Sequence, residues 1–392
     1  MKKLILLLGV ALGLVFGNLN AQTIDLEGVF TGKYRMEDMQ NLNWRPLTNQ
    51  YTFVKNDTII CVDAASAKIK ERISLHNINN RINGTPFKKI PFYQWLDKDQ
   101  IYFPTSNDII SISFAGVLTG TPLPKNAIDQ SLKHKLFVVE EDGNIFVKSE
   151  KNNYEPILLC PDTGNHIVFG KTVHRSEWGI GEGQYISPNG NYIAFYRMDE
   201  SMVEDYPLVD VTGRIAVETP IKYPMAGKTN HQVKVGIFDV QASLLAGKTV
   251  YHYIQTDPND GEFLTNVTFT PDEKYLFITH LNRAQNLALL IQYDVKTGQK
   301  LKVLIEERNN QYVDPSTRAY FLSQYPFFIW QSDRDGWNHF YLYNMNGKLI
   351  TQLTKGEWQV TELYGVDPKE ETIYFGSTNP NPTGNYVYSI NI

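Results

Sequence analysis

Short alternating strands separated by turns dominate the chain from about residue 45 onward. Runs rich in Tyr, Phe, Ile, Val and Thr alternate with Asp, Asn, Gly and Pro, and no ten-residue window carries a convincing helical stripe. This alternation of β-branched and aromatic residues with polar ones is typical of half-buried strands. In the clearest unit, residues 185–196, Ser-Pro-Asn-Gly makes a tight turn before an alternating strand. The pattern predicts an all-β fold.

The turn-and-strand unit recurs along the chain. A second copy occupies residues 269–278, and weaker copies occupy 93–103 and 365–375. Strand quartets that recur every ~40 to 50 residues are typical of a β-propeller, because one blade cannot bury both of its faces and must stack on neighbours around a ring. We therefore expect about seven blades within residues 45–392. A large β-sandwich or a β-helix is the alternative, and the Asp-Gly and Pro-Asn-Gly hairpin turns argue against a β-helix.

The N-terminus has the pattern of a secretory signal peptide. Met1-Lys2-Lys3 is positively charged, residues 4–16 form an apolar run, and Ala21 is a small residue at the expected cleavage point. The apolar run is shorter than the ~17 to 25 residues that span a bilayer. We expect cleavage after residues 1–21, a lead at 22–44, export to the periplasm or the cell exterior, and no membrane span in the mature protein.

The charge and the cysteine content of the chain argue against several classes of protein. The 37 Lys+Arg against 42 Asp+Glu give a net charge of −5, which argues against a nucleic-acid partner, because such proteins present a basic surface. The 2 cysteines, Cys61 and Cys160, are too few for a disulfide scaffold or a four-cysteine zinc site. We expect both to be free, buried thiols on different blades.

Motifs for catalysis and cofactor binding are missing from the sequence. No serine lies in Gly-x-Ser-x-Gly, His-Glu-x-x-His does not occur, and the Gly-Lys-Thr triplets lack the upstream glycine of a phosphate loop. We therefore predict no catalytic residue, no cofactor and no metal site in this chain.

Two stretches exceed what a scaffold needs. Residues 173–180 interleave charged side chains with Trp and Gly, which suits a loop that presents a carboxylate. Residues 202–231 are too long for a hairpin within a blade and should project as an arm. Both could equally be variable loops, since variation and function concentrate in loops.

The motifs in these stretches resemble a known family. They are His174-Arg175-x-Glu177-Trp178-Gly179-Ile180, Ser187-Pro-Asn-Gly-Asn followed by Ala194-Phe-Tyr-Arg-Met-Asp-Glu-Ser201, Tyr223-Pro-x-Ala-Gly-x-x-Asn-His231, Leu281-Asn-Arg-x-Gln-Asn286, Ser332-Asp-Arg-Asp-Gly-Trp337 and Leu353-Thr-Lys-Gly-x-Trp358. From about residue 40 to the end, the chain resembles the N-terminal β-propeller of bacterial members of the dipeptidyl peptidase IV subfamily of prolyl oligopeptidase-type serine peptidases. The resemblance implies an eight-bladed propeller that caps an α/β-hydrolase domain carrying a Ser-Asp-His triad.

The resemblance also implies a substrate site. In the family a glutamate pair grips the free α-amine of the peptide. Glu177 matches the second glutamate, Ser176 replaces the first, and Arg175 and Trp178 flank them, while Tyr312 falls where the family places an aromatic loop beside the substrate. A single carboxylate supplies less charge than a pair, so both dipeptidyl and tripeptidyl specificity stay open. The alternative role for Glu177 is a structural salt bridge with Arg175 or Arg197.

We expect a propeller that recognises the N-terminal amine and gates substrates of an exported peptidase cleaving after Pro or Ala. The chain stops at Ile392, after a strand resembling the seventh blade, so we expect an incomplete ring and no hydrolase domain in this chain.

The implied partners are a peptide with a free N-terminus, a hydrolase domain that is missing or on a separate chain, and a second copy bound through the arm. Two alternatives are a stand-alone propeller that binds peptides or protein partners without catalysis, and an enzyme with its own site in the central channel, which no His/Asp/Glu cluster supports.

Overall fold

The computed structural model describes residues 24–34, 39–82, 86–104, 108–114, 118–122, 124, 126–161 and 164–392. The predicted signal peptide lies outside these described residues. The chain divides into two compact units between Met39 and Gln40. In the first unit, α2 (Leu26–Thr31) begins where the side chain of Asp25 accepts a hydrogen bond from the backbone of Gly28. It ends at Gly32, whose left-handed backbone is the usual helix stop.

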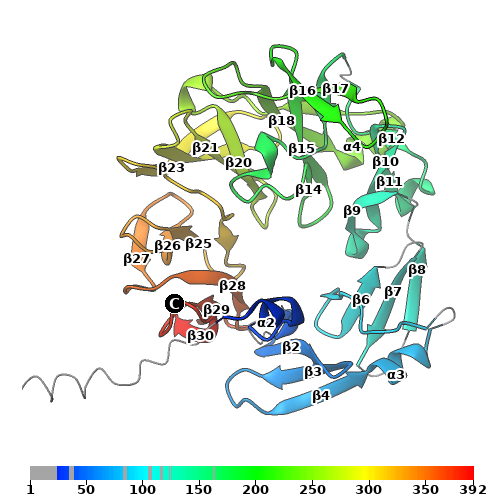
Figure 1. The fold of residues 1–392 in the computed structure, drawn as a ribbon, viewed down its shortest axis with the longest axis vertical. Helices are drawn as coiled ribbons and strands as arrows, with labels where there is room; N and C mark the ends of the chain where they lie inside the picture. The colour runs from blue at the N-terminus through cyan, green and yellow to red at the C-terminus, as the bar shows by residue number, and fades with distance from the viewer. Residues whose placement is uncertain are drawn as a thin grey trace, which may run out of the picture. The chain divides into compact units, whose positions relative to one another are not determined.

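The second unit is a ring of antiparallel sheets (Figure 1). The first three sheets contain β1 (Gln40–Trp44), β2 (Gln50–Lys55), β3 (Thr58–Asp63) and β4 (Ile69–Ser74); β5 (Gln94–Trp95), β6 (Gln100–Pro104), β7 (Asp108–Ser113) and β8 (Leu118–Pro122); and β9 (Ala127–Ser131), β10 (Leu136–Glu141), β11 (Asn144–Ser149) and β12 (Ile157–Leu158). The fourth sheet contains β13 (Ile167–Phe169), β14 (Gln184–Ile186), β15 (Tyr192–Asp199), β18 (Gln232–Asp239) and β19 (Tyr251–Tyr253).

The remaining sheets continue the same order. They contain β20 (Phe263–Phe269), β21 (Tyr275–Leu281), β22 (Leu287–Asp294) and β23 (Lys300–Arg308); β24 (Tyr320–Phe321), β25 (Phe327–Ser332), β26 (His339–Asn344) and β27 (Leu349–Gln352); and β28 (Val360–Val366), β29 (Thr372–Ser377) and β30 (Tyr386–Asn391). Two short helices, α3 (Leu75–Asn79) and α4 (Val240–Ala246), lie in connections. The predicted all-β propeller with about seven blades is confirmed.

Some strands of neighbouring sheets contact one another directly. β1 contacts both β5 and β28, and β9 contacts β14. The first strand of the ring begins at Gln40, inside the segment 22–44 that the sequence analysis treats as a lead. Among the described residues the seventh sheet has three strands where most others have four. The first and seventh sheets nevertheless meet directly, because the ring of Trp44 stacks on Tyr374 with centroids 4.2 Å apart.

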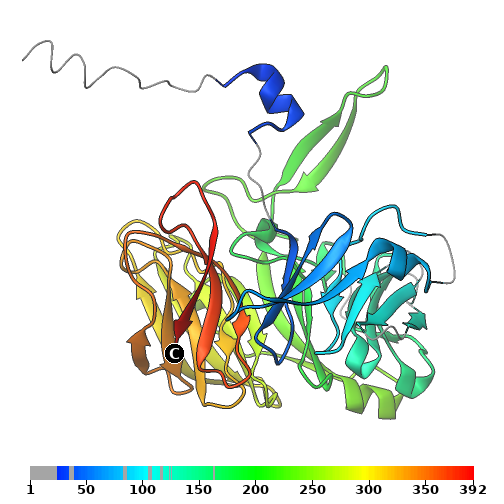
Figure 2. The same ribbon diagram turned by 90° about the horizontal axis from the view of Figure 1, so that it is seen from below.

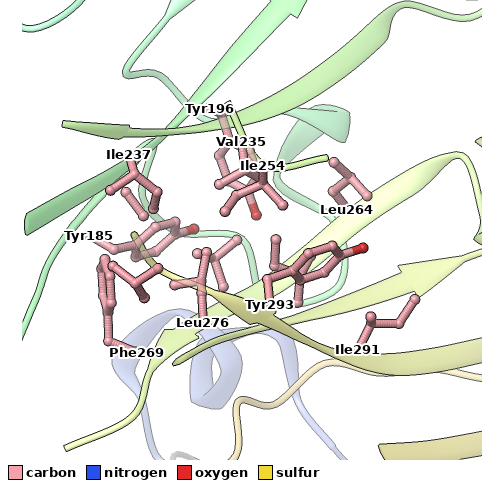
Figure 3. Packing of buried hydrophobic residues seen from close by; sticks show 14 of the residues in the cluster. Tyr185, Tyr196, Val235, Ile237, Ile254, Leu264, Phe269, Leu276, Ile291 and Tyr293 are labelled. Carbon is pink, nitrogen blue, oxygen red and sulfur yellow. The ribbon is translucent and has the colours of Figure 1, made fainter. Parts of the chain in front are cut away.

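Buried apolar side chains fill the spaces between consecutive sheets. Figure 3 shows the largest cluster, between the fourth and fifth sheets, where Tyr185 and Ile237 on one side face Phe269 and Leu276 on the other. Alternation within each strand supplies these residues, because every second side chain of a strand points to the same face. The aromatic content of the sequence is therefore explained by the many flat side chains that stacked sheets can bury.

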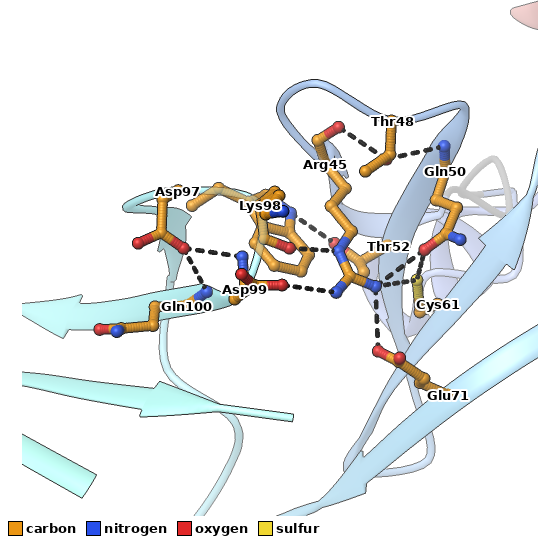
Figure 4. A network of polar contacts seen from close by, with 11 residues as sticks. Arg45, Thr48, Gln50, Thr52, Cys61, Glu71, Asp97, Lys98, Asp99 and Gln100 are labelled. Carbon is orange, nitrogen blue, oxygen red and sulfur yellow. Dashed lines mark hydrogen bonds and ion pairs between the residues drawn. The ribbon is translucent and has the colours of Figure 1, made fainter. Parts of the chain in front are cut away.

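The junction of the first and second sheets also contains a buried cation (Figure 4). Arg45, only 8% exposed, donates hydrogen bonds to Gln50 (2.8 Å), to the backbone oxygen of Lys98 (2.5 Å) and to Glu71 (3.0 Å). Its guanidinium lies 5.1 Å from the ring centre of Trp95. A buried charge needs such compensation to be tolerated, so Arg45 fixes how the second sheet meets the first.

The predicted arm is a two-stranded hairpin that extends from the fourth sheet (Figure 2). Its strands, β16 (Asp205–Asp210) and β17 (Val217–Lys222), pair in register, with Leu208 opposite Thr219. All six residues of β16 are exposed, which is unusual for a segment that contains Leu208 and Val209.

Both cysteines agree with the prediction from sequence. Cys61 and Cys160 are free and fully buried. Burial raises the pKa of the Cys61 thiol, so this thiol behaves as a small packing group. Within the described residues, no helix is both long and apolar enough to cross a bilayer.

Candidate functional site

The loop that carries Glu177 has an unusual backbone. His174, Arg175 and Ser176 all have left-handed conformations, with φ of 50°, 59° and 61°. Glu177 then returns to an extended conformation, and Trp178 is again left-handed at φ 52°. Each left-handed residue other than glycine costs ~1 to 2 kcal/mol, so the rest of the protein must hold this loop in place. Such strain is typical of functional sites.

The second half of the loop is held by the fifth sheet and by the connection between the fifth and sixth sheets. The ring of Trp178 packs on Phe263 with centroids 4.7 Å apart, and its backbone oxygen accepts a hydrogen bond from Thr265 (2.9 Å). Gly179 has φ of 74°, and a Cβ there would lie 2.1 Å from the backbone oxygen of Ser316. Only glycine allows this approach. The two residues that follow Glu177 are therefore held in place, Trp178 by β20 and Gly179 by the backbone of Ser316.

The first half of the loop is held by the base of the arm. Arg175 stacks on Tyr223 at 4.2 Å from the ring centre and donates a hydrogen bond to the backbone oxygen of Lys222 (3.0 Å). Arg175 is thus committed to the arm and makes no ion pair with Glu177. This arrangement leaves the Glu177 carboxylate available.

A histidine pair forms the floor under the loop. The Nδ1 of His174 lies 2.9 Å from the Nε2 of His231, and the backbone N–H of Leu264 donates to the Nε2 of His174 at 3.2 Å. Burial lowers the pKa of His174 well below its usual range. Burial, together with the charges of Arg175 and Arg283, lowers the pKa of His231 to about 4. Both rings are therefore neutral at pH 7.

Glu177 faces an open pocket of about 220 Å³. The pocket is lined by His174, Arg175, Glu177, Trp178, Tyr223, Pro224, Asn230, His231, Phe263, Arg283 and Gln285. Arg283 is already occupied, because it pairs with Glu262 (3.1 Å) and donates to the backbone oxygen of Lys228 (3.1 Å). Glu177 is exposed, and among the described residues its carboxylate has no hydrogen-bond or ion-pair partner. The pocket thus combines aromatic walls with one unpaired negative charge.

Three of the five residues predicted for substrate binding, Arg175, Glu177 and Trp178, lie in this pocket. Ser176 is exposed on the same turn but does not line the pocket. Tyr312 is 59% exposed and also lies outside the lining. The loop of Tyr312 is nevertheless tied to the pocket, since the N–H of Val313 donates to the backbone oxygen of Gln285 (2.7 Å).

The sequence analysis missed the remaining pocket walls as site residues. Tyr223, Pro224, His231, Arg283 and Gln285 do appear in the motifs that carried the family resemblance, and that was the available signal. Phe263 lies in none of those motifs. A hydrophobic residue at the start of a strand gives no indication that it faces a pocket.

A second polar pocket, of about 290 Å³, lies between β9 and β14. Burial raises the pKa of Asp129 in this pocket to about 6. Its other charges are paired, since Arg318 contacts Glu182 at 3.2 Å and stacks on Tyr185. In the described part of the chain, no three His, Cys, Asp or Glu side chains are grouped so as to hold a metal ion. The pocket of Glu177 is the stronger candidate, because it combines an unpaired carboxylate with aromatic walls.

Comparisons with solved structures agree with this fold. A Bacteroides ovatus protein assigned as a dipeptidyl aminopeptidase IV is 33% identical, with a TM-score of 0.71 over 91% of this chain and 52% of that one. The dipeptidyl peptidase 4 of Porphyromonas gingivalis is 23% identical, with a TM-score of 0.68 over 94% of this chain and 54% of that one. The second likeness is one of fold alone.

Comparisons of sequence extend the similarity. Dipeptidyl peptidase 4 of Arthroderma otae is 28% identical over 244 residues, which are 59% of this chain and 30% of that protein. The chain therefore spans about a third of this curated relative and about half of the solved chains. The family model for the dipeptidyl peptidase IV (DPP IV) N-terminal region matches residues 126–392, more than half of the chain. The chain accordingly belongs to the family of dipeptidyl peptidase IV N-terminal regions.

Proposed function

We propose that this chain is the substrate-recognising propeller of an exported dipeptidyl or tripeptidyl peptidase. In this proposal the propeller binds the free N-terminus of a peptide and admits substrates by size, and a hydrolase domain carries a Ser-Asp-His triad that cleaves after Pro or Ala. The names of the relatives support a peptidase context. The chain itself contains no Gly-x-Ser-x-Gly sequence, so catalysis is assigned to the partner domain.

The observation that carries the proposal is the unpaired carboxylate of Glu177 at the aromatic pocket. A peptide α-ammonium has a pKa near ~8 and is largely charged at neutral pH. A fixed carboxylate is its natural counter-ion, and charge-assisted hydrogen bonds are stronger than neutral ones. The loop is held on both sides of Glu177, so little ordering remains to be done when a peptide binds.

The test is peptide binding to this chain, which needs no catalytic domain. The probe is a short Ala-Pro peptide with a dye at its C-terminus, with either a free or an acetylated N-terminus, measured by fluorescence anisotropy. Removing one partner of a desolvated charge pair costs ~2 to 5 kcal/mol. We therefore expect Glu177→Ala and Glu177→Gln to weaken binding of the free peptide by more than about tenfold.

Two controls make the experiment decisive. Glu357→Gln changes another exposed glutamate, outside the pocket, and should leave binding unchanged. The acetylated peptide should bind weakly to the parent chain and should lose little further affinity in the Glu177 variants. Equal binding of free and acetylated peptides by the parent chain would exclude amine recognition by this site.

A further inference from the structure

The histidine pair beneath the loop has a defined direction of hydrogen bonding. A backbone N–H can only donate, so the Nε2 of His174 must accept from Leu264 and cannot carry a proton. The proton of neutral His174 is then on Nδ1 and is donated to the Nε2 of His231, 2.9 Å away. The proton of His231 is consequently on its Nδ1. Geometry thus assigns one tautomer to each ring.

This chain of hydrogen bonds joins three elements that are distant in sequence. Leu264 belongs to β20 of the fifth sheet, His174 begins the left-handed turn, and His231 lies between the arm and β18. The two rings stack with centroids 4.9 Å apart, and Phe263 meets His174 edge-on at 5.1 Å. His174 is 4% exposed and His231 is 5% exposed. Both rings are therefore buried, and each hydrogen bond of the pair has a defined donor and acceptor.

The pair is also connected to Glu177 through the backbone. The N–H of Glu177 donates to the backbone oxygen of His174 at 3.2 Å, which closes the left-handed turn. Because that turn is intrinsically unfavourable, the position of Glu177 depends on what holds His174. The contacts of Trp178 and Gly179 hold only the other end of the loop.

We propose that His174 and His231 are positioning residues for the amine site and that their hydrogen bond holds Glu177 where a peptide N-terminus can reach it. This inference rests on the proposed function, since it assigns the pair a role in amine binding. Both imidazoles line the pocket, and the role assigned to them is to place Glu177 rather than to bind the peptide. They link the base of the arm to the fifth sheet, and in this way they hold the turn that carries the Glu177 carboxylate.

The test compares two substitutions of His231. In His231→Gln the side-chain oxygen can still accept the proton of His174, whereas His231→Leu keeps the bulk and removes the acceptor. Loss of the acceptor leaves the Nδ1 proton of His174 unpaired in a buried place, so we expect His231→Leu to weaken binding of the free-amine Ala-Pro probe by about tenfold. We expect His231→Gln to recover most of this loss, because its side-chain oxygen restores the acceptor. Equal loss in both variants, or loss in neither, would overturn the proposal.

A second measurement does not depend on peptide binding. Position 177 is exposed and has extended backbone, and both native cysteines are buried, so a nitroxide can be attached selectively to Glu177→Cys. The label should be restrained in the parent background and with His231→Gln, and mobile with His231→Leu. Identical spectra in all three would reject the positioning role. A restrained label combined with absent amine binding would instead reject the proposed function and keep the role of the pair in ordering the loop.

The tautomers give a third readout. In spectra of the chain labelled with ¹⁵N-histidine, the Nε2 of His174 should be unprotonated and its Nδ1 protonated at pH 7. A proton on the Nε2 of His174 would contradict the assigned direction of the hydrogen bonds.

Discussion

Buried histidines carry the clearest electrostatic consequence at the scale of single residues. Burial lowers the pKa of both His231 and His280 to about 4. In an unfolded chain a histidine has a pKa near ~6.5. Between these values the unfolded state binds protons that the folded state does not, so stability rises with pH across this window. The contribution is complete above about pH 6.5 and is lost as the pH falls toward about 4.

We therefore expect the urea midpoint of the chain to fall as the pH is lowered from 7 to 4.5. His280→Gln should flatten part of this dependence, because the side chain can still bond the hydroxyl of Tyr293, which lies 2.8 Å from the Nε2 of His280, while no longer titrating. The measurement is urea denaturation at half-unit pH steps. Parallel curves for the parent and the variant would show that His280 does not contribute.

Single residues of the site divide into those that the sequence could predict and those that it could not. Glu177 and Trp178 were predicted because contiguous motifs carry them. The pairing of His174 with His231 could not be predicted, since 57 residues separate them and only the packing of the arm base brings them together. The alternative of a salt bridge between Glu177 and Arg175 or Arg197 is not seen among the described residues, and Arg175 stacks on Tyr223 instead.

At the scale of elements, the repeated turn has one feature that the sequence predicts and another that it does not. Three of the four copies predicted from sequence share a backbone geometry, with Gly190, Glu273 and Glu370 at the same position and φ of 68°, 58° and 56°, whereas the copy at 93–103 has no left-handed residue. Glu273 and Glu370 also accept hydrogen bonds from the neighbouring sheet. Glu273 accepts hydrogen bonds from Asn189 and Asn191 of the preceding sheet (2.6 and 2.7 Å).

Glu370 repeats this contact two junctions further along the ring, between the sixth and seventh sheets. Its carboxylate accepts from the backbone N–H groups of Ser323 and Gln324, at 2.6 and 2.8 Å. Alternation and turn residues predict strands and hairpins because they are local properties. Bonds from one turn to the turn of the neighbouring sheet are not local, so the sequence pattern did not reveal them.

The arm supports a prediction about assembly. A two-stranded hairpin is marginally stable in water by itself, yet Leu208 and Val209 are each 52% exposed and Ile215 is 81% exposed. We propose that a second copy of the chain covers these side chains. In sedimentation velocity at micromolar concentration we expect a dimer, and we expect Leu208→Asp combined with Val209→Asp to give a monomer.

The matched control for the arm is Leu245→Asp. Leu245 is 89% exposed on α4, away from the arm, so its substitution should leave the dimer intact. A parent chain that sediments as a monomer, or a dimer that survives the double substitution, would refute the role of the arm.

At the scale of the whole molecule, the junctions between sheets are not equivalent. Buried apolar clusters join each sheet to the next from the first sheet to the seventh. Among the described residues no such cluster joins the seventh sheet to the first. That junction contains the stacked pair of Trp44 and Tyr374 beside a pocket of about 200 Å³. The ring is therefore least cohesive at this seam between the seventh and first sheets.

The seam should be the place where the ring opens. Trp44 is half buried, lies against Gly365 and stacks on Tyr374. Burial and stacking together suggest a loss of about 2 kcal/mol for Trp44→Ala. Because a separated seam exposes strand edges and apolar faces, which drive association, we expect this variant to form larger species in light scattering. Amide exchange should accelerate first in β1 and in β28 to β30.

Trp337→Ala is the matched control, since Trp337 is also half buried but lies in the turn between β25 and β26, away from the seam. It should leave both the size distribution and the exchange of β1 unchanged. If exchange accelerates equally in all sheets of the Trp44 variant, the ring unfolds as one cooperative unit and the seam is not its weak point. If β1 and the seventh sheet exchange first, the contact between them breaks while the other sheets stay packed. This outcome is expected because each of the other junctions is held by its own buried cluster.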